Sequence, residues 1–316
     1  MSAPDVIAGF FLLKWYTDER VRGVRRECRE RGARNILMFL HYFHPQPILF
    51  QLGPLAIHWY GFLMVVGGLL GYWIALKLAR YYFPTRQLDN QITSLLIWFV
   101  VGAVIGARIY YVVYAWPTFQ NNLPDMFKIW QGGLAVHGVM FGGFIATLIF
   151  CHVKKLKFWL VADIAAVALC AGQIVGRWGN YFNQEIIGQP TDLPWGIPID
   201  FINRPAGYEQ FAYFHPAFLY EVIGSIIILT ILLLLHRARV KRGTWTNGNI
   251  FLTYLVLYST MRFCLEFVRI DYSPLVYGVR WAMIFSIMVI VGALTVILIN
   301  YWRNKTGLNR AIQDRL

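Results

Sequence analysis

A few polar residues interrupt the long apolar runs of this sequence, and their types are those that bind and transform a charged substrate. Arg177 and Arg262 lie at the ends of such runs, His137 stands just inside one, and Tyr60 opens another. The planar fork of a guanidinium matches phosphate oxygens with two hydrogen bonds, and a neutral imidazole can accept a proton near neutral pH. If they share one depth in a membrane, these side chains suit the anionic head group of a phospholipid.

Each of these residues also has a plainer interpretation. A long arginine side chain near a helix end can reach the membrane surface by snorkelling, which would explain Arg177 or Arg262 alone. His137 could be a packed histidine, and Tyr60 could belong to the aromatic belt of a membrane protein. Two pairings that the sequence suggests would be purely structural, namely Arg177 with Glu185 and Arg262 with Glu266.

The composition predicts the environment of these residues. Of the 316 residues, 58% are hydrophobic and 14% are charged, and the mean hydropathy is +0.49, whereas soluble domains contain about 25% charged residues. This excludes a soluble, disordered or collagen-like chain and predicts a polytopic membrane protein. The net charge of +13 is interpreted as loop charge that orients the chain in a bilayer, and no nucleic acid is expected as a partner.

The cysteines predict neither a disulfide scaffold nor a metal site. Cys28, Cys151, Cys170 and Cys264 form no CxxC pair and have no metal-ligand spacing. We therefore expect no cofactor, no metal and no thiol chemistry by the protein itself.

Seven apolar segments are long enough to cross a bilayer as helices, which takes about 20 residues each. We therefore predict an all-α polytopic membrane protein with seven transmembrane helices. Glycines spaced four apart in four of these segments would let helix backbones approach closely. The predicted spans are 59–78, 92–115, 134–153, 158–176, 217–235, 250–267 and 281–301. The glycine pairs are Gly67/Gly71, Gly102/Gly106, Gly138/Gly142 and Gly172/Gly176.

Lysine and arginine are concentrated in alternate loops, and such loops stay in the cytoplasm. They are frequent after the first, third and fifth spans and at the carboxyl end, and rare in the other loops. We predict that the amino side lies outside and the carboxyl end in the cytoplasm. The polar residues named above then fall at the outer end, together with Arg108, His215 and Glu221. Asp163, near the inner end, is interpreted as a residue at a helix start close to Lys154 and Lys155.

The chain divides into three regions. Residues 1–37 form an Arg-rich amino-terminal extension that is disordered or not translated, because Met38 is a second candidate start. Residues 38–303 form the seven-helix membrane domain, and residues 304–316 form a cytoplasmic tail. Within the membrane domain, the segment 179–216 is too rich in proline for a span and too aromatic for a solvated linker. We expect it to form a small extracytoplasmic cap over the site.

One segment is specific enough to indicate a family. The string Gly176-Arg-Trp-Gly-Asn-Tyr-Phe-Asn-Gln-Glu185 resembles the signature of the bacterial prolipoprotein diacylglyceryl transferase family, although Trp178 and the Tyr181-Phe182 pair differ from commoner members. Further blocks occur in the family's order, and the resemblance covers about residues 43–303. These blocks are His58-Trp-Tyr-Gly61, Gly132-Gly-Leu-Ala-Val-His-Gly138, Gly188, His215-Pro-Ala-Phe-Leu-Tyr-Glu221 and Arg262-Phe-Cys-Leu-Glu266, with Arg269 beyond.

The resemblance implies a multi-pass transferase of the bacterial cytoplasmic (inner) membrane. Such enzymes move the diacylglyceryl group of phosphatidylglycerol to the thiol of the lipobox cysteine in the signal peptide of a prolipoprotein. A thioether forms and glycerol 1-phosphate is released, in the first step of lipoprotein maturation. The implied partners are therefore phosphatidylglycerol and prolipoproteins. We expect the cap 179–216 to guide the peptide substrate to the site.

The resemblance also implies the site residues. His137, Arg177, Arg262 and Tyr60 are expected to be catalytic. The two arginines would form a clamp on the phosphate, and either His137 or Tyr60 would act as the base that takes the thiol proton. The residues expected to bind substrate are Arg177, Asn180, Asn183, Glu185, Gly188, Arg262 and Glu266.

Other classes of protein stay open on the sequence alone. A transporter of anionic solutes or lipids could also have an arginine-lined site, but it needs polar groups near the midplane and on both sides of it. The inner half of this chain offers little beyond Asp163. An intramembrane protease would need motifs that the sequence lacks, such as HExxH or GxSxG. A lipid-binding scaffold would differ only in an activity assay.

Overall fold

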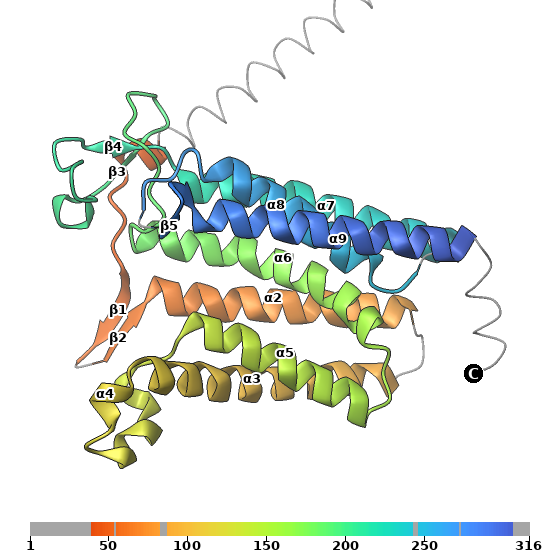
Figure 1. Ribbon diagram of the computed structural model, residues 1–316. Helices are drawn as coiled ribbons and strands as arrows, with labels where there is room; N and C mark the ends of the chain where they lie inside the picture. Colours follow the sequence, from red (N-terminus) through yellow and green to blue (C-terminus); the bar gives the residue numbers. More distant parts are fainter. Residues whose placement is uncertain (1–38, 54, 83–86, 243–245, 272, 306–316) are drawn as a thin grey trace, which may run out of the picture.

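The computed structural model describes residues 39–53, 55–82, 87–242, 246–271 and 273–305. The predicted extension 1–37 lies outside these residues, as does most of the predicted tail 304–316. The long helices are apolar along most of their length, so each satisfies its backbone polar groups internally, as a hydrocarbon environment requires. They are α2 (Trp59–Tyr82), α3 (Gln87–Tyr114), α5 (Val136–Val153), α6 (Phe158–Phe182), α7 (Ala217–Arg242), α8 (Asn249–Leu265) and α9 (Trp281–Lys305), and they lie along a common direction (Figure 1).

Six of the long helices have the length and composition of membrane spans. The exception is α8, which has 17 residues and so measures about 25 Å, against about 30 Å for a hydrocarbon core. The chain is therefore a mostly helical, polytopic membrane protein, as predicted. The seventh crossing, the orientation and the role of the cap stay predictions.

Three two-stranded antiparallel sheets lie together at one end of the bundle, which we call the strand-bearing end (Figure 1). These strands were not predicted, because two to five residues are too short to show an alternating pattern. The pairs are β1 (Ile48–Leu52) with β2 (Leu55–His58), β3 (Ile197–Pro198) with β4 (Tyr213–Phe214), and β5 (Leu275–Val276) with β6 (Val279–Arg280). The same end carries α4 (Trp116–Phe119) and the 3-10 turns η1 (Leu123–Phe127), η2 (Ile129–Gln131) and η3 (Phe201–Asn203).

Glycines mark the closest helix contacts. A Cβ added to Gly71 of α2 would lie 2.7 Å from the carbonyl oxygen of Ala168 in α6. A Cβ on Gly142 of α5 would lie 2.8 Å from the Cα of Gly106 in α3. No side chain fits at such distances, so the predicted role of the glycine pairs in helix packing is confirmed for α2 with α6 and for α3 with α5.

Two apolar cores hold the described chain together. The larger core joins α2, α6, α7 and α8, with one residue of α3, and the smaller one lies at the strand-bearing end, where the segment before β1 meets the ends of α6 and α7. The larger core contains Ala75, Leu78, Ala79, Ile92, Ile164, Ala166, Val167, Cys170, Ile228, Leu232, Ile250 and Tyr254. The smaller core contains Leu40, Tyr181, Ile187, Ile197, Ile199, Phe214 and Phe218.

Asp163 occupies the far end of the bundle, in the second turn of α6, which agrees with its predicted place near a helix start. Its side chain is fully buried, which its position in the sequence does not indicate. It accepts hydrogen bonds from Arg239 Nη1 at 2.7 Å and from the backbone N–H groups of Gly248 at 2.8 Å and Phe251 at 2.9 Å. Asp163 of α6 thus caps the first turn of α8 and pairs with α7, a contact between distant segments that spacing along the chain does not reveal.

Replacing Gly142 by alanine should destabilise the pairing of α3 and α5. The added methyl group would meet the backbone of Gly102 and Gly106, and overpacking of this kind costs about 1–3 kcal/mol. Gly68→Ala is the matched control, because a Cβ there meets nothing within 4 Å and alanine favours a helix by about 0.5–1 kcal/mol. Thermal unfolding in detergent should show a lower midpoint for Gly142→Ala only. Equal midpoints for the two variants would contradict this account of the packing.

Candidate functional site

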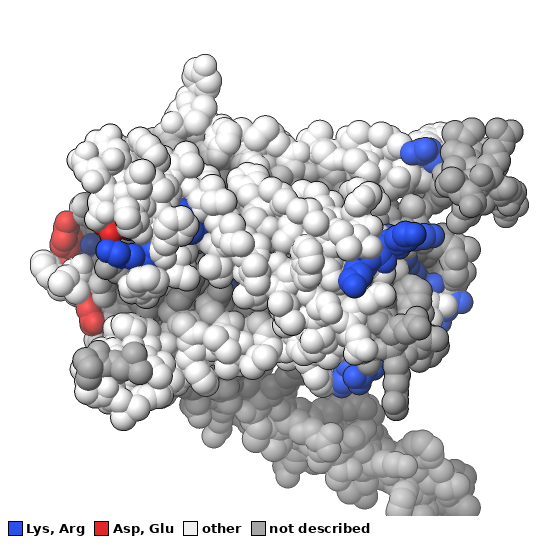
Figure 2. Space-filling view, turned by 90° about the horizontal axis from the view of Figure 1, so that it is seen from below, with Lys and Arg blue, Asp and Glu red and all other residues white. Residues whose placement is uncertain are grey.

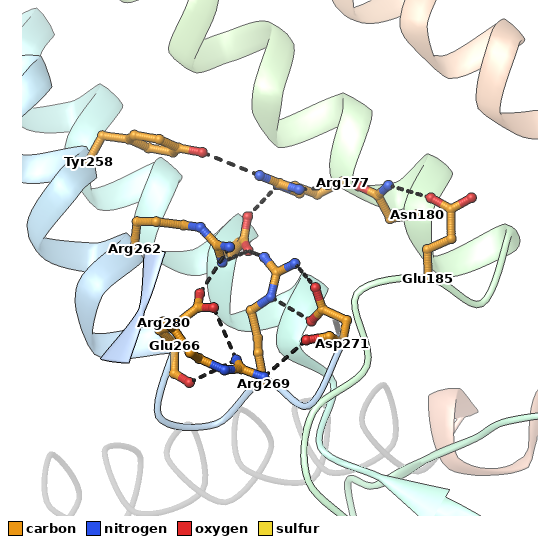
Figure 3. A network of polar contacts seen from close by, with 10 residues as sticks. Arg177, Asn180, Glu185, Tyr258, Arg262, Glu266, Arg269, Asp271 and Arg280 are labelled. Atoms are coloured by element: carbon orange, nitrogen blue, oxygen red, sulfur yellow. Dashed lines mark hydrogen bonds and ion pairs between the residues drawn. The ribbon is translucent and has the colours of Figure 1, made fainter. Parts of the chain in front are cut away.

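A buried ion-pair network at the strand-bearing end is built around the carboxylate of Glu221 in α7, of which only 1% is exposed. Glu221 pairs with Arg177 Nε of α6 at 2.5 Å, with Arg269 Nη1 at 3.0 Å and with Arg262 Nη1 of α8 at 3.8 Å. Figure 3 shows the three arginines converging from different segments. One carboxylate therefore fixes side chains that stand far apart in the sequence.

A second layer of charges holds these arginines from the other side. Glu266 pairs with Arg262 Nη2 at 2.9 Å, so the predicted pairing of these two residues is confirmed, and it also pairs with Arg280 Nη1 at 3.0 Å. Asp271 accepts two hydrogen bonds from Arg269, at 2.8 and 2.6 Å. This ion-pair network, largely withdrawn from solvent, thus contains four arginines and three carboxylates, a formal charge of +1.

Arg269 lies beyond the end of α8 and is charged in this setting. Burial disfavours its charged form. The hydrogen bonds and charge of Asp271, together with the charges of Glu221 and Glu266, more than compensate and hold the pKa of the Arg269 guanidinium above its usual value. The network therefore keeps Arg269 as a cation.

Two arginines of the network have donors that no strong acceptor occupies. Arg177 reaches Asn180 Oδ1 at 3.4 Å and the hydroxyl of Tyr258 at 3.3 Å, both longer than an ordinary hydrogen bond of about 2.9 Å. Arg262 Nη1 is buried and has no hydrogen-bond partner in the described part of the chain. A buried donor that lies 3.8 Å from its ion-pair partner and makes no hydrogen bond is costly, and a phosphate oxygen would satisfy it. The structure thus brings Arg177 and Arg262 together as the sequence predicted.

Glu185 occupies a different position from the one expected. Its carboxylate accepts hydrogen bonds from Asn180 Nδ2 at 3.2 Å and Asn183 Nδ2 at 2.9 Å. The predicted pairing of Arg177 with Glu185 is therefore wrong, because Arg177 pairs with Glu221 and meets Glu185 only through the amide of Asn180. Three predicted binding residues, Asn180, Asn183 and Glu185, do form one cluster beside the arginines.

The turn after α6 positions this cluster and anchors the segment that follows. Gln184 adopts a left-handed backbone with φ 53°, which lets the N–H of Glu185 bond to the carbonyl of Asn180 at 2.9 Å. The buried Gln184 side chain bonds to the backbone N–H and carboxylate of Asp200, at 2.7 and 2.6 Å, and to the carbonyl of Pro45 at 3.2 Å. Because α6 continues to Phe182, the first residues of the predicted cap 179–216 are helical.

Gly188 has a structural reason to lack a side chain. A Cβ there would lie 2.6 Å from the Cβ of His215, and its N–H donates to the His215 carbonyl at 3.2 Å. Its neighbour Gln189 donates its N–H to Val268 O at 2.8 Å, and Gly188 forms a β-bridge with Arg269. Gly188 therefore joins the segment after α6 to the backbone that carries Arg269. Its predicted role in binding stays a prediction.

The two candidate bases stand apart from the ion pairs. Tyr60 opens α2 and lies against the backbone of α6, where a Cβ on Gly179 would be 2.9 Å from its Cδ2, so it borders the helix turn that bears Arg177. His137 is exposed at the start of α5 and stacks on Tyr110 of α3, with ring centroids 5.6 Å apart. Among the described residues, no hydrogen bond or ion pair joins His137 to the network.

Several members of the network were not predicted as site residues. Glu221 and Arg269 stand in sequence blocks that the resemblance covers, but nothing in their spacing indicates that Glu221 joins three arginines. Tyr258, Asp271 and Arg280 gave no signal at all. No three His, Cys, Asp or Glu side chains among the described residues are grouped so that they could hold a metal ion.

The fold and the network define a multi-pass membrane protein with an arginine-rich polar site at one end of its helix bundle. Comparison with known proteins makes this more specific. The family model for prolipoprotein diacylglyceryl transferase matches residues 47–299. The chain therefore belongs to the prolipoprotein diacylglyceryl transferase family.

Relatives from several bacteria agree with this assignment, and each is named phosphatidylglycerol–prolipoprotein diacylglyceryl transferase. The protein of Acaryochloris marina is 42% identical over 244 residues, which is 77% of this chain and 86% of the relative. That of Synechocystis is 38% identical, covering 81% and 89% of the two chains. That of Bacillus velezensis is 39% identical, covering 85% and 96%.

Replacing Glu221 by glutamine should destabilise the protein. The amide keeps the shape but removes the charge that faces three arginines, and loss of one partner from a buried ion pair costs about 3–5 kcal/mol. Glu185→Gln is the control, because Glu185 is exposed and bonded to neutral amides, so its loss should cost less than about 1.5 kcal/mol. Thermal unfolding in detergent measures the difference. A Glu221→Gln variant as stable as Glu185→Gln would show that Glu221 does not hold the arginines in place.

Proposed function

We propose that this protein transfers the diacylglyceryl group of phosphatidylglycerol to the lipobox cysteine of prolipoproteins. The family to which the chain belongs and the names of its relatives support the reaction. One observation in the structure supports the site. Arg177 and Arg262 offer donors that are weakly bonded or make no hydrogen bond, within a network whose formal charge is +1, and a phosphodiester carries one negative charge.

The reaction is a substitution at the glyceryl carbon. The thiolate sulfur forms a bond to this carbon while the bond from the carbon to the phosphate oxygen breaks. The electron pair leaves with that oxygen, so that glycerol 1-phosphate is released and a thioether remains. The thiol proton must pass to a base, because a thiol attacks only as a thiolate, and His137 and Tyr60 are the two candidates.

The arginines act on the leaving group. Negative charge on the phosphate grows as the carbon–oxygen bond breaks, so donors aimed at the phosphate oxygens bind the transition state more strongly than the lipid. Arg177 and Arg262 have such donors, and Glu221 and Glu266 hold their guanidinium groups in place. Because the site is buried within an apolar bundle, the attraction is screened less than it would be in water.

The remaining predicted site residues are proposed to shape the pocket around the lipid. Asn180, Asn183 and Glu185 form a hydrogen-bonded cluster next to Arg177 and can orient the glycerol hydroxyl groups of the head group. Tyr60 of α2 borders the turn of α6 that carries Arg177, at Gly179. Gly188 keeps the following segment close to His215 and Arg269.

We propose further that the strand-bearing end faces outward from the bacterial cytoplasmic (inner) membrane. Most of the visible Lys and Arg side chains gather at the opposite end, and the visible Asp and Glu side chains lie at the strand-bearing end (Figure 2). Positively charged loops stay in the cytoplasm. On this proposal α8 is the seventh crossing, the segment 183–216 is the cap that guides the peptide, and residues 38–303 are one membrane domain.

The test is an assay of the purified protein in vesicles that contain phosphatidylglycerol. A peptide with a lipobox cysteine should become lipidated while glycerol 1-phosphate is released in equal amount. A peptide with serine in place of that cysteine is the control and should cause no release. Release that does not depend on the cysteine would contradict thiol transfer. A complete lack of release would favour the alternatives, an anion or lipid transporter or a lipid-binding scaffold.

Arg177→Lys should lower kcat by about 100-fold, corresponding to about 2–3 kcal/mol for one such donor. Lysine keeps the charge but loses the planar fork, and the interaction strengthens only as the leaving oxygen gains charge, so KM for the lipid should change little. Arg80→Lys, in the last turn of α2 at the opposite end, is the control and should keep its kcat. Near-normal kcat of Arg177→Lys at saturating lipid would contradict the clamp and would mean that Arg177 only orients the helix or snorkels to the membrane surface.

A further inference from the structure

The connection between α3 and α5 is wrapped around a single arginine side chain, that of Arg108 near the end of α3. Its Nε donates to Met126 O at 2.7 Å, and its Nη2 donates to Asp125 O at 2.7 Å and more weakly to Lys128 O at 3.5 Å. Its Nη1 donates to Gly132 O at 2.9 Å and Gly133 O at 3.0 Å. The guanidinium thus binds five backbone carbonyls of the segment 125–133.

These contacts distinguish Arg108 from Arg177 and Arg262. All its nitrogens donate to backbone carbonyls, and its guanidinium also lies near the rings of Phe119 and Tyr111, at 5.3 and 5.8 Å from their centroids. Its donors are therefore already engaged, whereas Arg262 Nη1 has no hydrogen-bond partner among the described residues. Arg108 is built to organise backbone and not to bind a phosphate.

The segment that Arg108 holds leads directly to His137. Gly132 and Gly133 have positive φ angles of 88° and 76°, which glycine adopts without strain. The N–H of Ala135 then donates to Ala107 O at 3.2 Å, and α5 begins at Val136. His137 follows and stacks on Tyr110 of α3. The stretch of α3 around Arg108 thus fixes both the approach to α5 and the ring of His137.

We propose that Arg108 is a positioning residue for the transfer reaction, which fixes the backbone of 125–133 so that His137 is presented to the site in one orientation. This inference rests on the proposed function and on His137 taking part in it. Lysine cannot replace Arg108, because an ammonium has three donors and no planar fork. Carbonyls left without a donor would then turn toward other partners.

Arg108→Lys is the first test, with Lys128→Gln as the matched control in the same segment. The side chain of Lys128 pairs with Asp125, and its replacement removes a cation from the loop without removing a contact of Arg108. We expect kcat of Arg108→Lys to fall by about tenfold or more, with KM for phosphatidylglycerol within about twofold, and Lys128→Gln to match the wild type. A raised KM with unchanged kcat would mean that Arg108 binds the lipid, which overturns the proposal.

A second variant disturbs the same contact without changing Arg108. A Cβ on Gly133 would lie 2.7 Å from Arg108 Nη1 and 2.5 Å from Tyr111 Cε1, so Gly133→Ala should reproduce the loss in kcat. The Gly133→Ala variant also tests the proposal if Arg108→Lys does not fold. In the His137→Asn background, either change should cause no further loss, because both act through His137. Losses that multiply, or a Gly133→Ala variant with normal kcat, would overturn the proposal.

A structural measurement separates this inference from the proposed function. In both variants trypsin should cleave after Lys128 faster than in the wild type, because the backbone there is no longer held, while the thermal midpoint stays above the assay temperature. If the wild-type protein releases no glycerol 1-phosphate, the proposed function fails and cleavage still reports on the loop. Unchanged cleavage in both variants would show that Arg108 does not fix this segment.

Discussion

The buried carboxylate of Glu221 is the interaction on which the site depends. Taking an ion out of water into an apolar bundle costs several kcal/mol unless partners of opposite charge surround it. Here Arg177, Arg262 and Arg269 supply those partners from α6, α8 and the segment beyond α8. The requirement is mutual for Arg177, which would lose its ion pair without Glu221, whereas Arg262 and Arg269 would keep their pairs with Glu266 and Asp271. The ends of three consecutive helices, α6, α7 and α8, are thereby held at one relative position.

The two ends of the bundle use the same kinds of side chain with different results. Asp163 is fully buried, and its carboxylate makes three hydrogen bonds of 2.7–2.9 Å, one of them from Arg239, so this pair serves as a fastening between helices. At the strand-bearing end, Arg177 pairs with Glu221 at 2.5 Å but its other contacts are long, and Arg262 Nη1 lies 3.8 Å from Glu221 and has no hydrogen-bond partner among the described residues. A saturated ion pair stabilises the fold, and an incompletely satisfied one can bind a ligand. The buried polar group at the far end therefore gives no support to a path for a transported anion.

The residues proposed to take part in the reaction come from different helices of the bundle. The phosphate-binding arginines come from α6 and α8, whereas His137 comes from α5, which packs against α3 through glycines on both helices. Tyr60 comes from α2, which packs on α6 in the same way. These close backbone contacts determine the positions of His137 and Tyr60. Where glycines leave no side chain between two helices, the backbones can pack together in only a few ways. Arg108 extends this control from the helices to the connection between them.

The sequence by itself determined the class of protein, the long apolar helices, the glycine contacts and the presence of arginines that suit a phosphate. These follow from local properties, namely apolar length, residue spacing and the chemistry of single side chains, and the pairing of Arg262 with Glu266 belongs with them because it spans one helical turn. Only the tertiary structure decided that Arg177 pairs with Glu221 rather than Glu185 and that Asp163 is buried against Arg239. Contacts between side chains distant in sequence depend on how the helices pack. The periodicity of one segment does not show which other segments it packs against.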